Sequence, residues 1–117
     1  MLYKKPKQAK EYLQKALNID PEHDIALIEL GKIDKSEGNT VAAQVKFRKA
    51  YDLYLKQWKT NSLPKYAYGW FATVAEELGE NNFAKEIRAS APKTESEAYY
   101  NKENLSMTKT KALTNNN

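Results

Sequence analysis

The sequence predicts an all-α fold built from consecutive helix–turn–helix units. Ala9 and Ala43 lie 34 residues apart, and the same interval separates Ala16 from Ala50. Small residues that recur in this way let helix backbones approach closely, while larger apolar residues between them fill the remaining space. Residues that commonly stop helices fall at the ends of the expected segments: Pro21, Gly38 and Gly79.

We expect five helices, at residues 7–19, 23–37, 40–60, 65–78 and 82–90. Pro6 suits the start of the first helix, because an N–H group there would have no intrahelical partner. The segment 20–24 supplies turn and acidic signals for the second helix. Asn39 or Thr40 is expected to cap the third helix, and the polar segment 60–64 to separate it from the fourth.

The third helix is expected to be longer than its neighbours. Gly38 and Gly79 are 41 residues apart, as are Ala43 and Ala84, which is seven residues more than the first interval. Seven residues make about two helical turns. An insertion of that size roughly preserves the side of the helix that faces the core.

A polar tail follows the fifth helix, which Asn81 and Asn82 open and which ends before Pro92. We therefore divide the chain into a helical array at 1–92 and a tail at 93–117. Thr94 and Glu97 could form a capping box, which favours a short terminal capping helix at 95–104. The end of the chain, from residue 106, is expected to be disordered in isolation.

The central segment resembles the tetratricopeptide repeat (TPR) through Leu27, Leu30, Gly31, Gly38, Ala43, Phe47 and Ala50. The resemblance covers roughly residues 4–91. The copy before it is half present, with Ala9, Leu13, Ala16, Leu17, Ile19 and Pro21. The copy after it has Tyr68, Phe71, Ala72, Gly79 and Ala84, but Arg88 where a large apolar residue is usual. Asp34 occupies an aromatic position of the repeat, so we expect weaker or more solvated packing there.

The resemblance implies a right-handed array of helical hairpins that acts as a non-enzymatic scaffold for protein–protein interaction. In such arrays the first helix of each pair lines a concave groove, which implies these partner-binding residues: Ile25, Ile28, Lys32, Lys35, Tyr66, Trp70, Thr73 and Glu77. The partner would be a peptide or helix of unknown identity, held by apolar anchors. Trp70 has a second interpretation, as part of the core. Some members of the family clamp the terminal carboxylate of a partner with lysine, asparagine and arginine side chains, and the asparagines and arginines of that set are missing here.

The array is expected to begin in the middle of a unit, which leaves its first helix without a hairpin partner. The apolar residues of that helix, Leu13, Ala16 and Leu17, would then be partly uncovered. The alternative function is therefore self-association, or assembly within a longer TPR protein, giving a homo-oligomer or an intramolecular contact. A third interpretation is an accessory module of an enzyme or transporter.

Composition restricts the classes of function. The 117 residues include 19 basic and 15 acidic side chains, for a net charge of +4, and no cysteine. Such a mild excess favours a solvated lysine surface over a nucleic-acid site. Apolar runs fall short of the roughly 20 residues of a membrane span, and no signal peptide is recognisable. We therefore expect a cytoplasmic protein with neither nucleic-acid nor membrane partners.

The residues that could support catalysis are few. His23 is the one histidine, and it lies between Glu22 and Asp24 in an expected turn, where a solvated role is more common than metal binding. Glu76 and Glu77 are adjacent acids at an expected helix end, where solvation is more common than acid–base catalysis. We expect no catalytic residues, metal or cofactor, and no enzymatic activity.

Overall fold

The computed structural model describes residues 5–92, which form five helices and no strand. They are α1 (Pro6–Ile19), α2 (Asp24–Ser36), α3 (Thr40–Lys59), α4 (Ala67–Glu77) and α5 (Asn81–Ala89). The all-α prediction is confirmed, and the observed helix ends lie within two residues of the expected ones. The expected capping helix at 95–104 and the disordered end from residue 106 lie outside the described residues.

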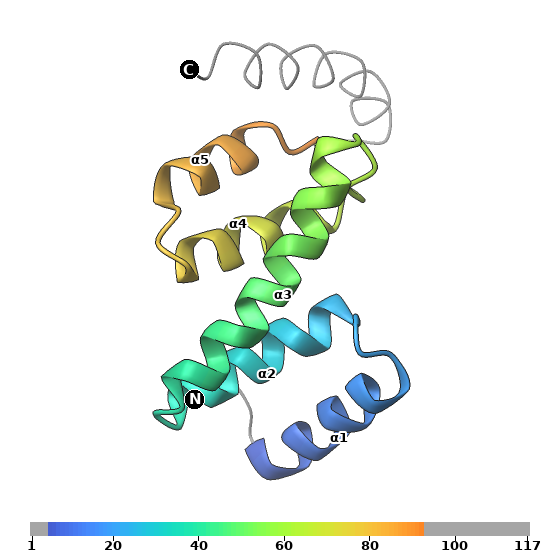
Figure 1. Cartoon of the computed structure of the whole chain (residues 1–117), viewed down its shortest axis with the longest axis vertical. Helices are drawn as coiled ribbons and strands as arrows, with labels where there is room; N and C mark the ends of the chain where they lie inside the picture. Colours follow the sequence, from blue (N-terminus) through green and yellow to red (C-terminus); the bar gives the residue numbers. More distant parts are fainter. Residues whose placement is uncertain (1–4, 93–117) are drawn as a thin grey trace.

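Helix α3 connects two pairs of helices (Figure 1). Helices α1 and α2 lie at one end of the molecule, and α4 and α5 lie at the other. Helix α2 packs against α1 and α3, helix α4 packs against α3 and α5, and α2 also touches α4 directly. At 20 residues α3 is the longest of the five, as the widened glycine spacing predicts.

Two glycines end the helices that precede α3 and α5. Gly38 and Gly79 have φ angles of 82° and 84°, in the left-handed region where a Cβ atom is costly. The N–H of the residue that follows each glycine then bonds back to a carbonyl of the last helical turn. Asn39 donates to Asp34 and Glu80 donates to Ala75, each at 2.8 Å. Both ends therefore have the closed geometry expected at a glycine-terminated helix.

An aromatic cluster packs α3 against the second helix pair. The Tyr51 and Tyr54 rings lie 5.6 and 5.8 Å from the ring of Phe71 on α4. Phe83 on α5 has its ring 5.6 Å from that of Phe71 and 5.2 Å from that of Trp58, nearly perpendicular to both. Edge-to-face packing of this kind stabilises a core beyond the area that it buries. The extended end of α3 thus supplies the surface on which α4 and α5 pack.

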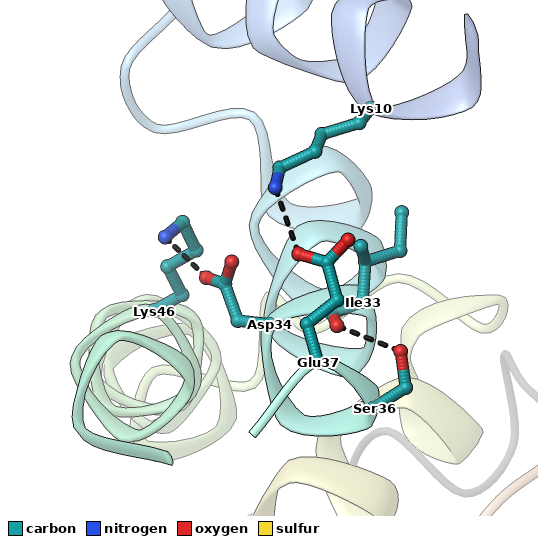
Figure 2. A network of polar contacts seen from close by, with 6 residues as sticks. All are labelled: Lys10, Ile33, Asp34, Ser36, Glu37 and Lys46. Atoms are coloured by element: carbon teal, nitrogen blue, oxygen red, sulfur yellow. Dashed lines mark hydrogen bonds and ion pairs between the residues drawn. The ribbon is translucent and has the colours of Figure 1, made fainter. Parts of the chain in front are cut away.

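Asp34 is buried, whereas weaker or more solvated packing was expected at its position. It is only 6% exposed, and its Oδ2 lies 2.5 Å from Nζ of Lys46 on α3 (Figure 2). Nearby, Lys10 on α1 donates to Glu37 at 2.8 Å. A buried carboxylate is tolerated when a cation pairs with it. An ion pair between α2 and α3 therefore occupies this position.

A substitution at Gly31 tests how closely α2 and α3 approach each other. A Cβ atom added there would lie 2.6 Å from Cε1 of Phe47, whose ring is fully buried and cannot move aside freely. We expect Gly31→Ala to lower the free energy of unfolding by about 1–3 kcal/mol. Gly69→Ala on α4 is the matched control, because a Cβ there meets no atom within 4 Å.

The control should raise stability by up to about 1 kcal/mol, since alanine is the better helix former. Urea unfolding followed by far-ultraviolet circular dichroism measures both changes. Equal effects of the two substitutions would contradict the close contact between Gly31 and Phe47.

Candidate functional site at the α2–α4 face

Helices α2 and α4 are joined along one surface by three side-chain contacts. Tyr66 Oη donates to Asp24 Oδ2 at 2.9 Å, at the start of both helices. Farther along, Lys32 Nζ lies 5.0 Å from the ring centroid of Trp70. Near the end of both helices, Lys35 Nζ lies 2.6 Å from Glu77 Oε1. We call this surface the α2–α4 face and define it by Asp24, Lys32, Lys35, Tyr66, Trp70 and Glu77.

The order of these contacts shows that α2 and α4 run in the same direction. Five residues that the sequence assigned to a partner-binding groove lie on this one face: Lys32, Lys35, Tyr66, Trp70 and Glu77. They come from two helices separated by the whole of α3. The structure therefore brings most of the predicted set together.

The burial of Ile28 corrects the set of partner-binding residues that the sequence predicted. Its side chain is fully buried and belongs to the core, so it cannot contact a partner. Helix α2 packs against α1, α3 and α4, and it buries residues around most of its circumference. Ile28 consequently has no open side. Ile25 and Thr73 are half-buried, and the Thr73 hydroxyl donates to the Gly69 carbonyl of its own helix at 2.9 Å.

Two aromatic side chains give the α2–α4 face an accessible apolar component. Tyr66 is 56% exposed. Trp70, one turn farther along α4, is half-buried, packs against the core and lies beneath the Lys32 ammonium group. The two interpretations of Trp70 are therefore not exclusive, because part of its surface is packed and part remains open. A cation near an indole ring is favourable by about 0.5–1 kcal/mol at such partly exposed sites.

Asp24 is the residue of this face whose contacts sequence reasoning missed. Besides the bond from Tyr66, its Oδ2 accepts a 2.7 Å hydrogen bond from Tyr54 Oη on α3. One carboxylate thus connects α2, α3 and α4. The sequence marked Asp24 as a turn acid beside His23 and gave no sign of its two partners, because they lie 30 and 42 residues away.

We call Asp24 with its partners Tyr54 and Tyr66 the Asp24 joint. Its electrostatics keep the carboxyl group ionised and both tyrosine hydroxyls protonated. Burial opposes ionisation of Asp24, but the hydrogen bonds from Tyr54, Tyr66 and nearby backbone N–H groups outweigh it and hold the pKa of the carboxyl below its ordinary value. Burial, and then the bond to Asp24, raises the pKa of Tyr54 and of Tyr66. At neutral pH the carboxylate therefore accepts and both hydroxyls donate.

Helix α1 presents a second accessible surface. The predicted self-association residues Leu13, Ala16 and Leu17 are half-buried, and α1 contains no fully buried residue. Its most exposed apolar side chains are instead Tyr12 at 76% and Ile19 at 85%. They lie seven residues apart, about two turns, on one side of the helix. Sequence reasoning missed Tyr12, although its helical spacing to Ile19 was a usable signal.

His23 has a structural role in this fold. It is the N-cap residue of α2, and its Nδ1 accepts a hydrogen bond from the Ala26 N–H at 3.2 Å. Such a bond satisfies one of the free N–H groups at a helix start. Residues 5–92 hold no group of three or more histidine, aspartate or glutamate side chains placed to bind a metal ion. Over the same residues, no helix is both long enough and apolar enough to cross a membrane.

The pH dependence of stability tests the Asp24 joint. Because folding lowers the pKa of Asp24, its contribution is complete above the unfolded pKa of about 3.9 and is lost as the pH falls through the lower folded value. We expect Asp24→Asn to lower the free energy of unfolding by about 1–2 kcal/mol at neutral pH. The difference from the unmodified chain should shrink steadily below about pH 4.

Urea unfolding at a series of pH values measures this difference. Glu86→Gln, on an exposed position of α5, is the matched control and should change stability by less than about 0.5 kcal/mol. A difference between Asp24→Asn and the unmodified chain that grows in acid would contradict the assigned hydrogen bonds.

Comparisons with protein-family models, with curated proteins and with solved structures give no match to this chain. The geometry of residues 5–92 is therefore the basis on which the function is inferred.

Proposed function

We propose that this chain is a non-enzymatic protein-interaction module of the TPR type that binds a peptide or helix of a partner on the α2–α4 face. The observation that carries the proposal is the pair formed by Tyr66 and Trp70, one turn apart and accessible on that face. Exposed or half-exposed aromatics of this kind are frequent energetic anchors of interfaces. The direct contact of α2 with α4, and the packing of each against the helix that follows it, also supports a repeat of helical hairpins.

Charged groups beside the aromatics would orient the partner. Lys35 and Glu77 form an ion pair at the surface, and such pairs are worth about 0–1 kcal/mol. A partner can therefore exchange this pair for its own polar groups at little cost. Lys32 is held over Trp70 and could contact a partner carboxylate or carbonyl while it stays over the ring. Aromatic anchors with polar groups around them suit a short segment with one or two apolar residues.

Peptide selection tests the proposal without a known partner. Randomised peptides displayed on phage are selected on the full chain, and enriched peptides are then titrated against variants. We expect Tyr66→Ala and Trp70→Ala each to weaken binding by about tenfold or more, in line with hot-spot residues. Lys85→Ala on the exposed side of α5 is the control and should leave affinity unchanged.

Circular dichroism of each variant verifies that the fold is retained, which matters most for the half-buried Trp70. Unchanged affinity for both aromatic variants, or failure to enrich any peptide, would contradict the proposal.

Self-association through α1 is a second candidate function. Tyr12 and Ile19 favour it, because both are exposed on the same side of the helix and would bury apolar surface against a partner. The contact would pack the outer side of α1 against a second copy of the chain. The half-buried Leu13, Ala16 and Leu17 would support that side of α1 from behind.

Sedimentation velocity over a range of concentrations tests this second function. We expect the unmodified chain to form dimers, and a variant with both Tyr12→Gln and Ile19→Gln to remain monomeric, because the contact loses its apolar groups. Val41→Gln with Val45→Gln, two exposed valines of α3, is the matched control and should still dimerise. A monomer at every concentration of the unmodified chain would exclude this function.

A further inference from the structure

The outer side of α3 carries one continuous stripe of exposed residues. They recur at steps of three and four, which places them on a single side of the helix. We call them the outer α3 stripe: Val41, Val45, Arg48, Asp52, Lys56 and Lys59. The buried residues of α3, including Phe47 and Tyr54, lie on the opposite side. The stripe is therefore separate from the α2–α4 face and spans almost the full length of α3, about 27 Å.

Two valines form the apolar end of this stripe. Val41 is 79% exposed and Val45 is 64% exposed, one turn apart. A β-branched residue on a solvated helix lowers helix stability by about 0.5 kcal/mol relative to alanine. Because both side chains are mostly exposed, burial within residues 5–92 offsets little of that cost. A partner that covers these valines would bury apolar surface that stays exposed in the folded chain, and this burial would favour binding.

The rest of the stripe is cationic. Arg48, Lys56 and Lys59 carry three positive charges against the single carboxylate of Asp52. None of these three cations belongs to an ion pair within the described part of the chain. The guanidinium of Arg48 lies 5.2 Å from the Tyr51 ring centroid, which restrains it on the outer surface. The charges are thus available to a ligand of opposite sign.

We propose that the outer α3 stripe docks an acidic amphipathic helix of a partner protein. Apolar side chains of that helix would cover Val41 and Val45, and its carboxylates would pair with Arg48, Lys56 and Lys59. Charge complementarity selects an acidic ligand and steers its approach. The valine pair selects a ligand that also offers apolar side chains at the matching end.

The composition of the stripe favours a protein over other anionic ligands. Nucleic-acid surfaces combine cations with stacking aromatic side chains, and the stripe contains valines instead. A helix that lies on an anionic membrane needs an apolar side along its length, whereas here the apolar part ends at Val45. An acidic helix with apolar residues at one end matches both parts of the surface.

A displayed library of acidic helical peptides tests this proposal on the full chain. The peptides have about 18 residues, the length of the stripe, with fixed glutamates and varied apolar positions. Enriched peptides are titrated by fluorescence anisotropy at low and raised salt. We expect the double variant Val41→Ser with Val45→Ser to weaken binding at least about tenfold at both salt concentrations.

The charge variant Arg48→Gln with Lys56→Gln should weaken binding and also reduce its salt dependence, because it removes the cations that pair with the peptide. Lys85→Gln is the matched control on α5 and should change neither quantity. All of these side chains are exposed, so circular dichroism should show an unchanged fold. Trp70→Ala should leave this binding unchanged, which separates the outer α3 stripe from the α2–α4 face.

Three results would overturn the proposal. The first is failure of the library to yield a peptide that binds the unmodified chain. The second is a peptide whose affinity survives both double variants. The third is tighter binding of single-stranded DNA or of phosphatidylserine vesicles that depends on the cations but not on the valines. That last result would assign the stripe to phosphate groups.

Discussion

The buried side of α3 is the constraint on which the rest of the structure depends. This helix presents Phe47 toward Gly31 of α2, and Tyr54 and Trp58 toward the second pair of helices. Of the helices that pack around it, α1 depends most on its neighbours, since it buries no residue completely. The position of every other helix follows from where it packs against α3 or against a helix already packed there.

The Asp24 joint adds a polar connection to this apolar one. The carboxylate links the starts of α2 and α4 to the C-terminal half of α3 through two tyrosine hydroxyls. Apolar packing alone tolerates small shifts of one helix along another, whereas a hydrogen-bonded carboxylate has a narrow range of favourable geometry. The joint therefore determines the relative register of α2 and α4, and with it the shape of the face that these helices form. Lys46 and Asp34 play a similar part between α2 and α3.

The helix ends could be predicted from the sequence because the residues that start and end helices act locally. Gly38, Gly79 and Pro6 act within a few residues of their own position, so their effect on helix ends can be inferred without knowledge of the fold. The burial of Ile28 could not be inferred in this way, because it depends on how three other helices surround α2. The partners of Asp24 and Asp34 could not be inferred for a related reason. Each carboxylate is stabilised by partners on other helices, and spacing along a single helix does not indicate such partners.

The parallel course of α2 and α4 places two helix N-termini at the same end of the face they share. The backbone dipoles make such an end electropositive, and by itself it would attract an anion. The ionised Asp24 already occupies that position. A terminal carboxylate of an incoming chain would meet a negative charge there rather than two free helix ends. The carboxylate that joins the helices therefore offsets the partial positive charge of both helix ends, so this end of the face is not a free anion site.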